Sequence, residues 1–414
     1  MKQPIAYAID FGTSNSAIAV AYRRQVAPLD ELTDPGVPSM LYLDAVGLEL
    51  VGDKAAQQYL LGFDPTQNRL MSSLKSFLAT PTHLTQPTKS WGRTWSLEDL
   101  TKIILRDLKR QADERLNADV KRVLIGHPVV FPGAEGEGDQ FETLQTLALK
   151  RLAKAAHSAG FKEVEFLDEP TAALCHDDLT SGINVALDFG AGTFDISIIR
   201  YRSRPRATEV LATYGVAVGG DEFDGVVFDL ALRKRLGLDN LRWGDSISEA
   251  RTTSGMLQLV RNPNALDRLA GYVQNKPQSG LRILKRIIEH GQVYALSKAV
   301  ENAKIQLSNA TTATVELFRP DAGINLKEEV RRDDFDMSIS DDLNQIFEVI
   351  DQALKTAEIT PREVGQVVLT GGSCKIPAFS RRVHSKFPSS QVREASVASR
   401  VALGLALEAR RLWA

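Results

Sequence analysis

The spacing of apolar residues changes along the chain, and each change predicts a strand or a helix. Strands are predicted for the apolar runs at residues 5–10, 16–23, 38–44, 120–131, 163–168, 184–188, 194–200 and 366–370. Apolar residues at helical spacing predict helices at residues 96–117, 139–160, 292–308 and 341–354. Ser96 and Asp99 are spaced to form a capping box at the start of the first helix. Residues 237–292 have the weakest pattern, with helical patches broken by Gly, Pro and Asn.

The order of these elements repeats in the two halves of the chain. A strand, a glycine-rich turn and a second strand open the sequence, and the same order returns at residues 184–200. Helices and further strands follow in each half. We therefore expect two related lobes of mixed α/β structure that face each other.

The two glycine-rich turns are candidate phosphate-binding loops. The residues DFGT at 10–13 are echoed by DFGA at 188–191. Glycine lets the backbone approach a ligand, and the amides of such a turn can converge on an anion. An aspartate beside a phosphate is favourable when a divalent cation lies between them, so Asp10 and Asp188 are predicted to orient hydrated Mg²⁺. Either turn alone is typical of a plain β-turn, and only the duplication favours phosphate binding.

Two further features are candidates for binding a nucleoside. In VVLTGGSCKIP, a Gly-Gly turn ends a predicted strand, and Pro377 can begin the next helix. In the helix at 292–308, Ser297, Glu301, Lys304 and Ser308 form a polar stripe. Each feature alone is more typical of an ordinary turn or a solvated helix face.

Composition and missing motifs exclude several classes of protein. Lys+Arg (50) and Asp+Glu (52) nearly balance, which gives no electrostatic case for nucleic acid or anionic membranes. The Walker loop, a GxGxxG turn after a strand, HExxH and paired CxxC motifs are all absent. Two cysteines, no secretory leader and no long apolar run lead us to expect a soluble, cytoplasmic monomer.

These residues carry a resemblance to the actin-like ATPase superfamily. The matching stretches are AIDFGTSNS, PSMLYL, VGDKA, EPTAA, LDFGAGTFDISI, VGGDEFD, ENAKIQLS and LTGGSCKIP, which span residues 5–377. They resemble the nucleotide-binding domain of the heat-shock-70 (DnaK-type) chaperones. The SLKSFL segment and the region 225–295 resemble the short YegD-like members that lack a peptide-binding domain. The resemblance implies a duplicated actin-like (ribonuclease H-like) fold with a nucleotide cleft between two lobes.

The resemblance also implies roles for individual residues in binding ATP or ADP with Mg²⁺. Lys75 matches the lysine that reaches the transferred phosphate, and Glu169, with Thr193, matches the group that arranges the attacking water. Asp188 completes the implied catalytic set. The implied phosphate-loop residues are Asp10, Gly12, Thr13, Ser14 and Asn15, then Asp188, Gly190, Gly192, Thr193 and Asp195. The implied ribose and adenosine contacts are Gly219, Gly220, Glu301, Lys304, Ser308, Gly371, Gly372, Ser373 and Lys375.

The domain boundaries follow from the same comparison. Lobe I is expected at 1–178 with the Lys75 subdomain at about 38–117, lobe II at 179–394 with a variable subdomain at about 224–308, and a C-terminal helix at 395–414 packing back towards lobe I. The chain departs from the family pattern in two places. Ile305 stands where a basic residue usually stacks on the base, and Ala398 and Ser399 stand where an acidic residue is usual. Loss of that stacking removes a cation–π contribution of about 0.5–2 kcal/mol.

These features leave three hypotheses for the function. The leading hypothesis is a slow Mg-dependent ATPase of the chaperone family, in which lobe closure around ATP acts as a switch read by a protein client, co-chaperone or exchange factor. A small-molecule kinase on the same fold is an alternative, although no lone aspartate outside the phosphate loops offers itself as a base. The third hypothesis is an ATP-dependent filament-forming protein.

Overall fold

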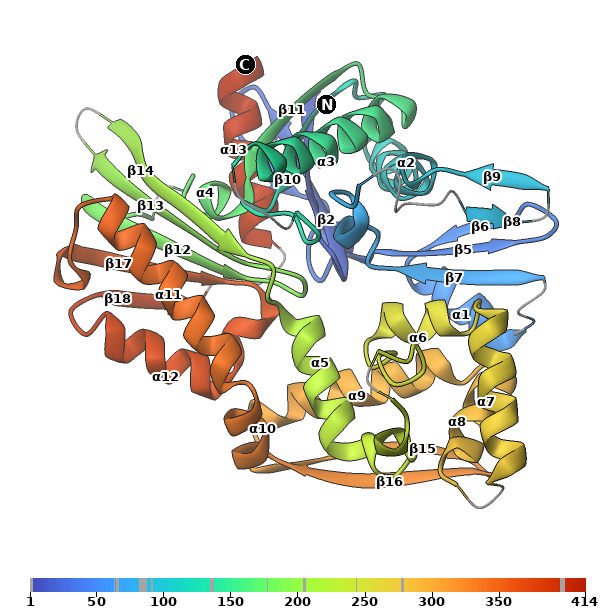
Figure 1. The fold of residues 1–414 in the computed structure, drawn as a ribbon. Helices are drawn as coiled ribbons and strands as arrows, with labels where there is room; N and C mark the ends of the chain where they lie inside the picture. Colours follow the sequence, from blue (N-terminus) through green and yellow to red (C-terminus); the bar gives the residue numbers. More distant parts are fainter. Residues whose placement is uncertain are drawn as a thin grey trace.

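The structure is a computed structural model. It describes residues 3–62, 64, 67–81, 88–90, 92–134, 138–176, 178–203, 206–242, 244–276, 279–394 and 399–414. Two lobes, each built on its own β-sheet, lie side by side (Figure 1). Within these residues, none of the helices combines the length and the apolar character that a membrane crossing requires.

The sheet of lobe I has the spatial order β11-β10-β1-β2-β3, with β4 paired to β2. Its strands are β1 (Pro4–Phe11), β2 (Asn15–Tyr22), β3 (Val26–Pro28), β4 (Val37–Pro38), β10 (Arg122–His127) and β11 (Glu163–Asp168). β1 and β2 are antiparallel, whereas β10 runs parallel to β1 and β11 runs parallel to β10. The strands predicted from the apolar runs at 5–10, 16–23 and 163–168 are therefore confirmed, and the run at 120–131 forms the shorter strand β10.

Helices cover both faces of this sheet. Tyr7 and Ile9 of β1 pack with α2 (Leu97–Leu116) and α3 (Asp139–Ser158), whereas Ala6 and Ala8 pack with α13 (Ser399–Trp413). The small alanine side chains let α13 come close to the sheet. The capping box of Ser96 and Asp99 at the start of α2 is confirmed. Residues 395–398 of the expected C-terminal segment lie outside the described residues.

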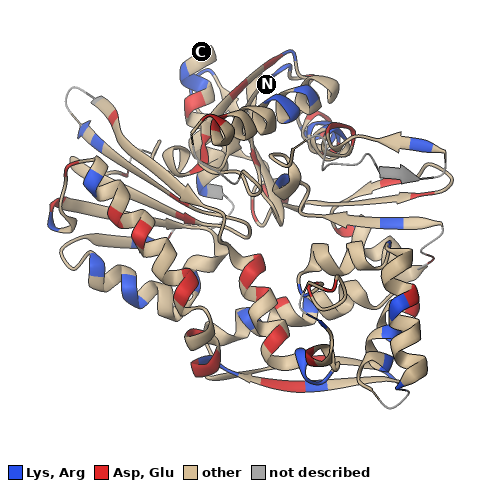
Figure 2. Ribbon diagram, in the orientation of Figure 1, with Lys and Arg blue, Asp and Glu red and all other residues tan. Residues whose placement is uncertain are grey.

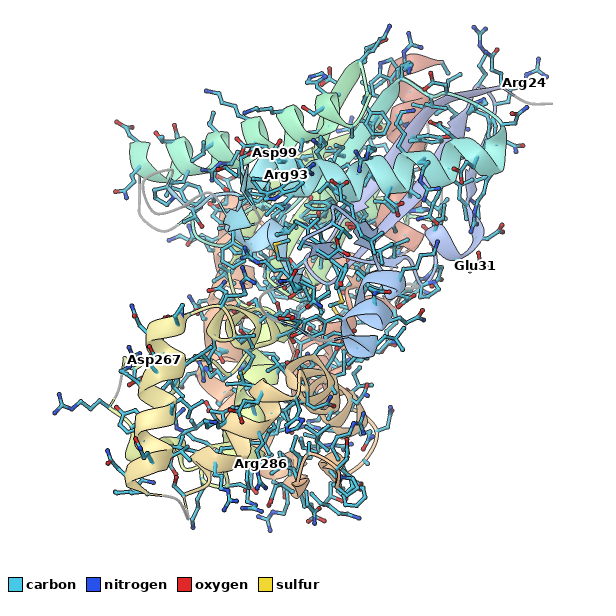
Figure 3. The ribbon with its side chains drawn as sticks, turned by 90° about the vertical axis from the view of Figure 1, so that its right-hand side faces the viewer. Arg24, Glu31, Arg93, Asp99, Asp267 and Arg286 are labelled. Atoms are coloured by element: carbon cyan, nitrogen blue, oxygen red, sulfur yellow. The ribbon has the colours of Figure 1, made fainter. Side chains whose placement is uncertain are left out.

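A smaller subdomain extends from lobe I. It contains β5 (Met40–Asp44), β6 (Glu49–Val51), α1 (Asp53–Leu61), β7 (Asn68–Ser72), β8 (Thr88–Ser90), β9 (Arg93–Trp95) and the 3₁₀ turns η1 (Asp30–Leu32) and η2 (Leu74–Phe77). The strands pair in the order β6-β5-β7, with β8 and β9 as a separate hairpin. The side view in Figure 3 shows Arg93 and Asp99 on this lobe, well separated from Asp267 and Arg286 of lobe II.

The sheet of lobe II has the order β14-β13-β12-β17-β18. Its strands are β12 (Gly182–Phe189), β13 (Phe194–Ser203), β14 (Arg206–Val216), β17 (Val364–Thr370) and β18 (Gln391–Glu394). The associated helices are α4 (Glu169–Ala173), α10 (Arg332–Ser338), α11 (Ser340–Thr356) and α12 (Pro377–Lys386), with the 3₁₀ turns η5 (Pro361–Glu363) and η6 (Gly372–Lys375). Pro377 begins α12, as the sequence predicts.

The lower part of lobe II in Figure 1 contains the weakly patterned residues 237–292 together with the elements on either side of them. Its elements are α5 (Gly220–Phe228), η3 (Asp229–Arg233), η4 (Leu238–Asn240), α6 (Thr253–Leu259), α7 (Pro263–Asn275), α8 (Leu281–Glu289), α9 (Val293–Leu307), β15 (Thr312–Arg319) and β16 (Ile324–Arg331). α6 packs against β7 of lobe I, and one apolar cluster joins Tyr59 and Leu70 to Met256 and Leu257. The two lobes therefore touch at this end as well as at their sheets.

Charged residues of both signs are mixed over both lobes in Figure 2. The first turn of α5 carries Asp221 and Glu222 and no basic residue. This acidic turn lies next to the cleft described below.

Candidate active site

Residues from both lobes line a cavity of about 390 Å³. Most of the residues predicted from sequence meet there, although they come from distant parts of the chain. The predicted residues in its lining are Asp10, Gly12, Thr13, Ser14, Asn15, Lys75, Glu169, Asp188, Gly190, Gly192, Thr193, Gly220, Glu301, Lys304, Ser308, Gly371, Gly372 and Ser373.

Three of the residues that the resemblance implies lie outside that lining. Asp195 is fully buried, and its Oδ1 accepts a hydrogen bond from the backbone N–H of Val129 at 2.9 Å. Gly219 is the N-cap of α5, and a Cβ there would lie 2.3 Å from the carbonyl oxygen of Ala191. Lys375 is exposed and lines a neighbouring cavity. Their assignment to nucleotide binding stays a prediction.

The prediction of a polar stripe on the helix at 292–308 is wrong for Ser297. Ser297 of α9 is 9% exposed and donates a hydrogen bond to the carbonyl oxygen of Val293 at 3.1 Å. It therefore belongs to the packed side of the helix. Glu301, Lys304 and Ser308 do face the cavity.

The two candidate phosphate loops have the same construction. In the first hairpin Phe11 pairs with Ser16, and in the second Phe189 pairs with Phe194, so each loop has four residues. Hydroxyl groups from other segments hold both loops, because Ser39 donates to the Gly12 carbonyl at 2.8 Å and Ser373 donates to the Gly190 carbonyl at 2.9 Å. The repeat seen in the sequence is thus a repeat of local structure.

Glycine is required in the first loop because the chain folds back on itself. A Cβ at Gly12 would lie 2.0 Å from the carbonyl oxygen of Asn15. That separation is far below any contact distance, so a larger residue would open the turn.

A buried ion pair joins the lobe I subdomain to the centre of the cleft. Nζ of Lys75 lies 2.6 Å from Oε1 of Glu169, and the two side chains are 4% and 7% exposed. Lys75 lies in η2, directly after β7 and Ser73. Glu169 is the first residue of α4, whose N-terminus is capped by Asp168 through a 3.0 Å hydrogen bond from the N–H of Thr171.

The electrostatics of the cleft favour a bound cation. Burial raises the pKa of Asp188 to about 6, with Glu169 adding to the effect, although a 2.8 Å hydrogen bond from Thr370 opposes it. Burial and Glu169 likewise raise the pKa of Asp10 well above its ordinary value. Burial lowers the pKa of Lys75, but Glu169 and Asp10 outweigh it and the net pKa is raised. Three carboxylates thus share one ammonium group, and a divalent cation would balance the excess.

The carboxylates fit a hydrated cation better than a protein cage. No group of three or more His, Cys, Asp or Glu side chains encloses a metal position among the described residues. Mg²⁺ commonly uses one or two carboxylates, retained waters and substrate phosphates. Asp10 and Asp188 suit that mode of binding.

The other end of the cleft is organised by Lys304 of α9. Its Nζ donates to the carbonyl oxygen of Gly220 at 2.7 Å and lies 2.8 Å from Oδ1 of Asp224. These bonds tie α9 to the start of α5. Ile305, the next residue, is 53% exposed and lines the cavity, so an apolar surface stands at this end.

Asp221 and Asp224 line the cavity but were not among the predicted site residues. Burial, and then Asp224, raise the pKa of Asp221 to about 7. Acidic residues directly after the Gly-Gly turn are a sequence signal that could have found both. Asp34, Pro35 and Val401 also line the cavity, and no local pattern links them to the phosphate loops.

Comparisons with known proteins show which family the chain belongs to. The family model described as Hsp70 protein matches residues 6–239 and 282–413. The chain is 24% identical to the chaperone protein DnaK of Thermosipho melanesiensis, with 99% of this chain and 59% of that protein covered. It is 28% identical to the chaperone protein HscA of Salmonella agona, with 99% and 58% covered.

The unmatched residues 240–281 contain α6 and α7, in the region with the weakest sequence pattern. The chain spans about three-fifths of the length of the curated relatives named above. The family match covers most of the chain and both candidate phosphate loops. The protein therefore belongs to the Hsp70 family and has its actin-like ATPase fold.

Proposed function

We propose that this protein binds Mg-ATP in the cleft between its lobes and hydrolyses it slowly, with closure of the lobes acting as a chaperone switch. The observation that supports this most directly is the buried Lys75–Glu169 pair between two matched loops that carry Asp10 and Asp188. Members of the Hsp70 family are ATPases that bind ATP and ADP. A cleft with a lysine, paired aspartates and a buried glutamate has the groups that phosphoryl transfer needs.

Each residue has a defined part in this proposal. Asp10 and Asp188 would hold hydrated Mg²⁺, which would neutralise charge on the phosphates. Lys75 stays charged because its pKa is raised, so its ammonium group can stabilise the transferred phosphate. Glu169 and the hydroxyl of Thr193 would orient the attacking water. Glu301, Lys304 and Ser308 would contact ribose and base.

The conformational switch is supported by the two contacts between lobes. The lobes meet at their sheets through α4 and α13, and they meet again where α6 packs on β7. We expect the second contact to open when nucleotide is exchanged. The relatives are named as chaperones, so we extend the proposal to a protein client or co-chaperone that reads this motion. Membership of the Hsp70 family does not favour the kinase and filament alternatives.

Single-turnover hydrolysis of Mg-ATP without any acceptor tests the proposal. We expect the wild type to release phosphate and Thr193→Ala to release it much more slowly. Lys386→Ala is a suitable control, because Lys386 is a surface residue of α12 that pairs with Asp351. Tight ATP binding without hydrolysis in the wild type would rule out the ATPase, and failure to bind ATP would rule out the whole proposal.

A further inference from the structure

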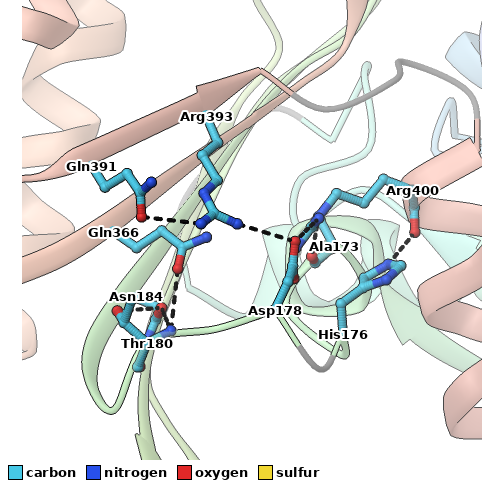
Figure 4. Close-up of polar contacts among 9 residues, drawn as sticks. All are labelled: Ala173, His176, Asp178, Thr180, Asn184, Gln366, Gln391, Arg393 and Arg400. Carbon is cyan, nitrogen blue, oxygen red and sulfur yellow. Dashed lines mark hydrogen bonds and ion pairs between the residues drawn. The ribbon is translucent and has the colours of Figure 1, made fainter.

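A second polar cluster lies at the junction of the two lobes, outside the lining of the nucleotide cleft (Figure 4). Its centre is Asp178, in the segment between α4 and β12. The guanidinium group of Arg400, on α13, forms two hydrogen bonds to the Asp178 carboxylate, from Nη1 at 2.9 Å and from Nη2 at 2.8 Å. Arg393 of β18 approaches the same carboxylate at 3.6 Å.

Arg400 makes further contacts to the same segment. Its Nε donates to the carbonyl oxygen of Ala173, the last residue of α4, at 2.9 Å. The carbonyl oxygen of Arg400 accepts a hydrogen bond from Nε2 of His176 at 2.8 Å. The side chain of Arg400 is 13% exposed. One largely buried arginine thus uses all three nitrogens of its guanidinium group on a single short segment.

The two elements on either side of this segment, α4 and β12, each carry a cleft residue. α4 is five residues long, so it begins with Glu169 and ends with the carbonyl that Arg400 holds. β12 carries Asp188 near its far end. Thr171 in the middle of α4 lies 2.9 Å from the hydroxyl of Ser197 on β13, which ties α4 to lobe II.

α13 also packs directly beside Glu169. A Cβ placed on Gly126 would lie 3.0 Å from Cδ1 of Leu405 and 3.1 Å from Cγ of Glu169, so both side chains bound the same small space. Val401, which follows Arg400, lines the cleft. A shift of α4 relative to α13 would therefore move the Glu169 carboxylate within the cleft.

We infer that Arg400 is a positioning residue for ATP hydrolysis: by holding Asp178 and the Ala173 carbonyl together, it fixes α4 and hence the Glu169 carboxylate. We call this arrangement the Arg400 clamp, and it consists of Arg400, Asp178 and the carbonyl of Ala173. The inference rests on the proposed ATPase function. The clamp acts through Glu169 and touches none of the residues at the adenosine end, so it controls the rate of hydrolysis more than the affinity for nucleotide.

The kinetic test compares Arg400→Ala, Asp178→Ala and the double variant with the wild type. Displacing a group that orients the attacking water slows the reaction, and we expect single-turnover hydrolysis to fall roughly 10- to 100-fold. The dissociation constant for ATP is expected to change by no more than about twofold. The double variant should be no slower than Arg400→Ala, because both substitutions remove the same clamp.

Two more variants separate the clamp from a general effect on the fold. In Arg400→Lys the single ammonium group can bind Asp178 or the carbonyl of Ala173, but not both in the same geometry. We therefore expect this variant to keep only part of the wild-type rate of ATP hydrolysis. Arg411→Ala is the matched control, because Arg411 lies on the same helix and pairs only with Glu408 in the described structure. It should hydrolyse ATP at the wild-type rate.

Cys175 provides a readout that needs no hydrolysis. It lies between Ala173 and His176, with its Sγ–H directed to the carbonyl oxygen of Thr171 at 3.4 Å. The other cysteine, Cys374, is buried and distant in sequence, so peptide mapping after alkylation with iodoacetamide distinguishes the two. We expect Cys175 to be alkylated several times faster in Arg400→Ala than in the wild type or in Arg411→Ala.

The outcomes are distinguishable. If wild-type protein does not hydrolyse ATP, the proposed function fails, and the inference fails with it. If the wild type is active but the clamp variants hydrolyse ATP at its rate, the inference alone is overturned. It is also overturned if Arg400→Ala weakens ATP binding as much as it slows hydrolysis, or if Cys175 reacts at an unchanged rate.

Discussion

Nζ of Lys75 and Oε1 of Glu169 are 2.6 Å apart, although the two residues are separated by 94 positions in the chain. The pair is almost wholly buried, and it lies beside two more carboxylates, those of Asp10 and Asp188. It therefore links the lobe I subdomain to the helix that begins at the cleft. Its two partners are expected to respond differently to substitution.

Lys75→Met should abolish most of the activity and also destabilise the protein without nucleotide. Removal of the ammonium group leaves a buried carboxylate unpaired among others, which typically costs about 3–5 kcal/mol. Loss of a group that stabilises phosphate charge should slow hydrolysis roughly 100- to 1000-fold. Urea unfolding and single-turnover hydrolysis measure the two effects.

The double variant Lys75→Met/Glu169→Gln is the control for this prediction. It removes both charges, so stability should return towards that of the wild type while hydrolysis stays slow. A double variant as unstable as Lys75→Met would contradict the electrostatic explanation.

Ile305→Arg should strengthen the binding of ATP. Ile305 is half exposed in the cavity lining, so an arginine at this position can lie over the base without displacing a buried group. A cation–π contact of about 0.5–2 kcal/mol corresponds to a dissociation constant roughly 2- to 30-fold lower. Titration calorimetry with ATP measures this dissociation constant for the variant and the wild type. Tripolyphosphate, which has no base, is the matched ligand, and an equal gain for it would show that the added charge alone is responsible.

Local patterns predicted much of the fold because capping and strand alternation depend on neighbouring residues. The box of Ser96 and Asp99, the start of α12 at Pro377 and the two four-residue loops could all be found this way. α3 likewise ends at a glycine: its C-cap is Ala159, and Gly160 follows with a positive φ of 107°, the position at which glycine commonly ends a helix.

Long-range contacts could not be predicted from local patterns. Lys75 stands between Leu74 and Ser76, neighbours that give no local signal for a site, and its role is assigned by resemblance alone. Ser297 looked polar in sequence but is buried, because its hydroxyl bonds to the helix backbone. Arg400 and Asp178 are separated by 222 positions, and no sequence spacing points to their contact.

Asp221 should make the stability of the nucleotide-free protein depend on pH. Its pKa is raised from 3.8 to about 7 by burial and then by Asp224, so the folded state holds a proton that the unfolded state has already lost. Its contribution to stability is therefore greatest below about pH 4, decreases as pH rises to about 7 and then stays level. In that interval the free energy of unfolding falls by about 1.4 kcal/mol for each pH unit.

Asp221→Asn removes this dependence. The free energy of unfolding of the variant should exceed that of the wild type by an amount that grows as pH rises from 4 to 7. Urea unfolding at several pH values measures this difference. Asp267→Asn, on the exposed face of α7, is the control and should follow the wild type. A constant difference between Asp221→Asn and the wild type at all pH values would contradict the assignment.

Gly404→Ala should be strongly destabilising because α13 and α4 touch through their backbones. A Cβ at Gly404 would lie 1.9 Å from the carbonyl oxygen of Ala172 and 3.3 Å from Nε2 of His176. The helices would have to separate, at a cost of about 1–3 kcal/mol or more. Gly271→Ala in α7 is the matched control, because nothing lies within 4 Å of its added Cβ, and it should stabilise the protein by about 0.5–1 kcal/mol.

The same substitution distinguishes packing from catalysis at this junction. Since α4 begins with Glu169, separation of α13 from α4 should slow hydrolysis even under conditions where Gly404→Ala remains folded. Single-turnover rates measured well below its unfolding midpoint test this. A folded Gly404→Ala protein with wild-type activity would show that the contact between α13 and α4 supports stability alone.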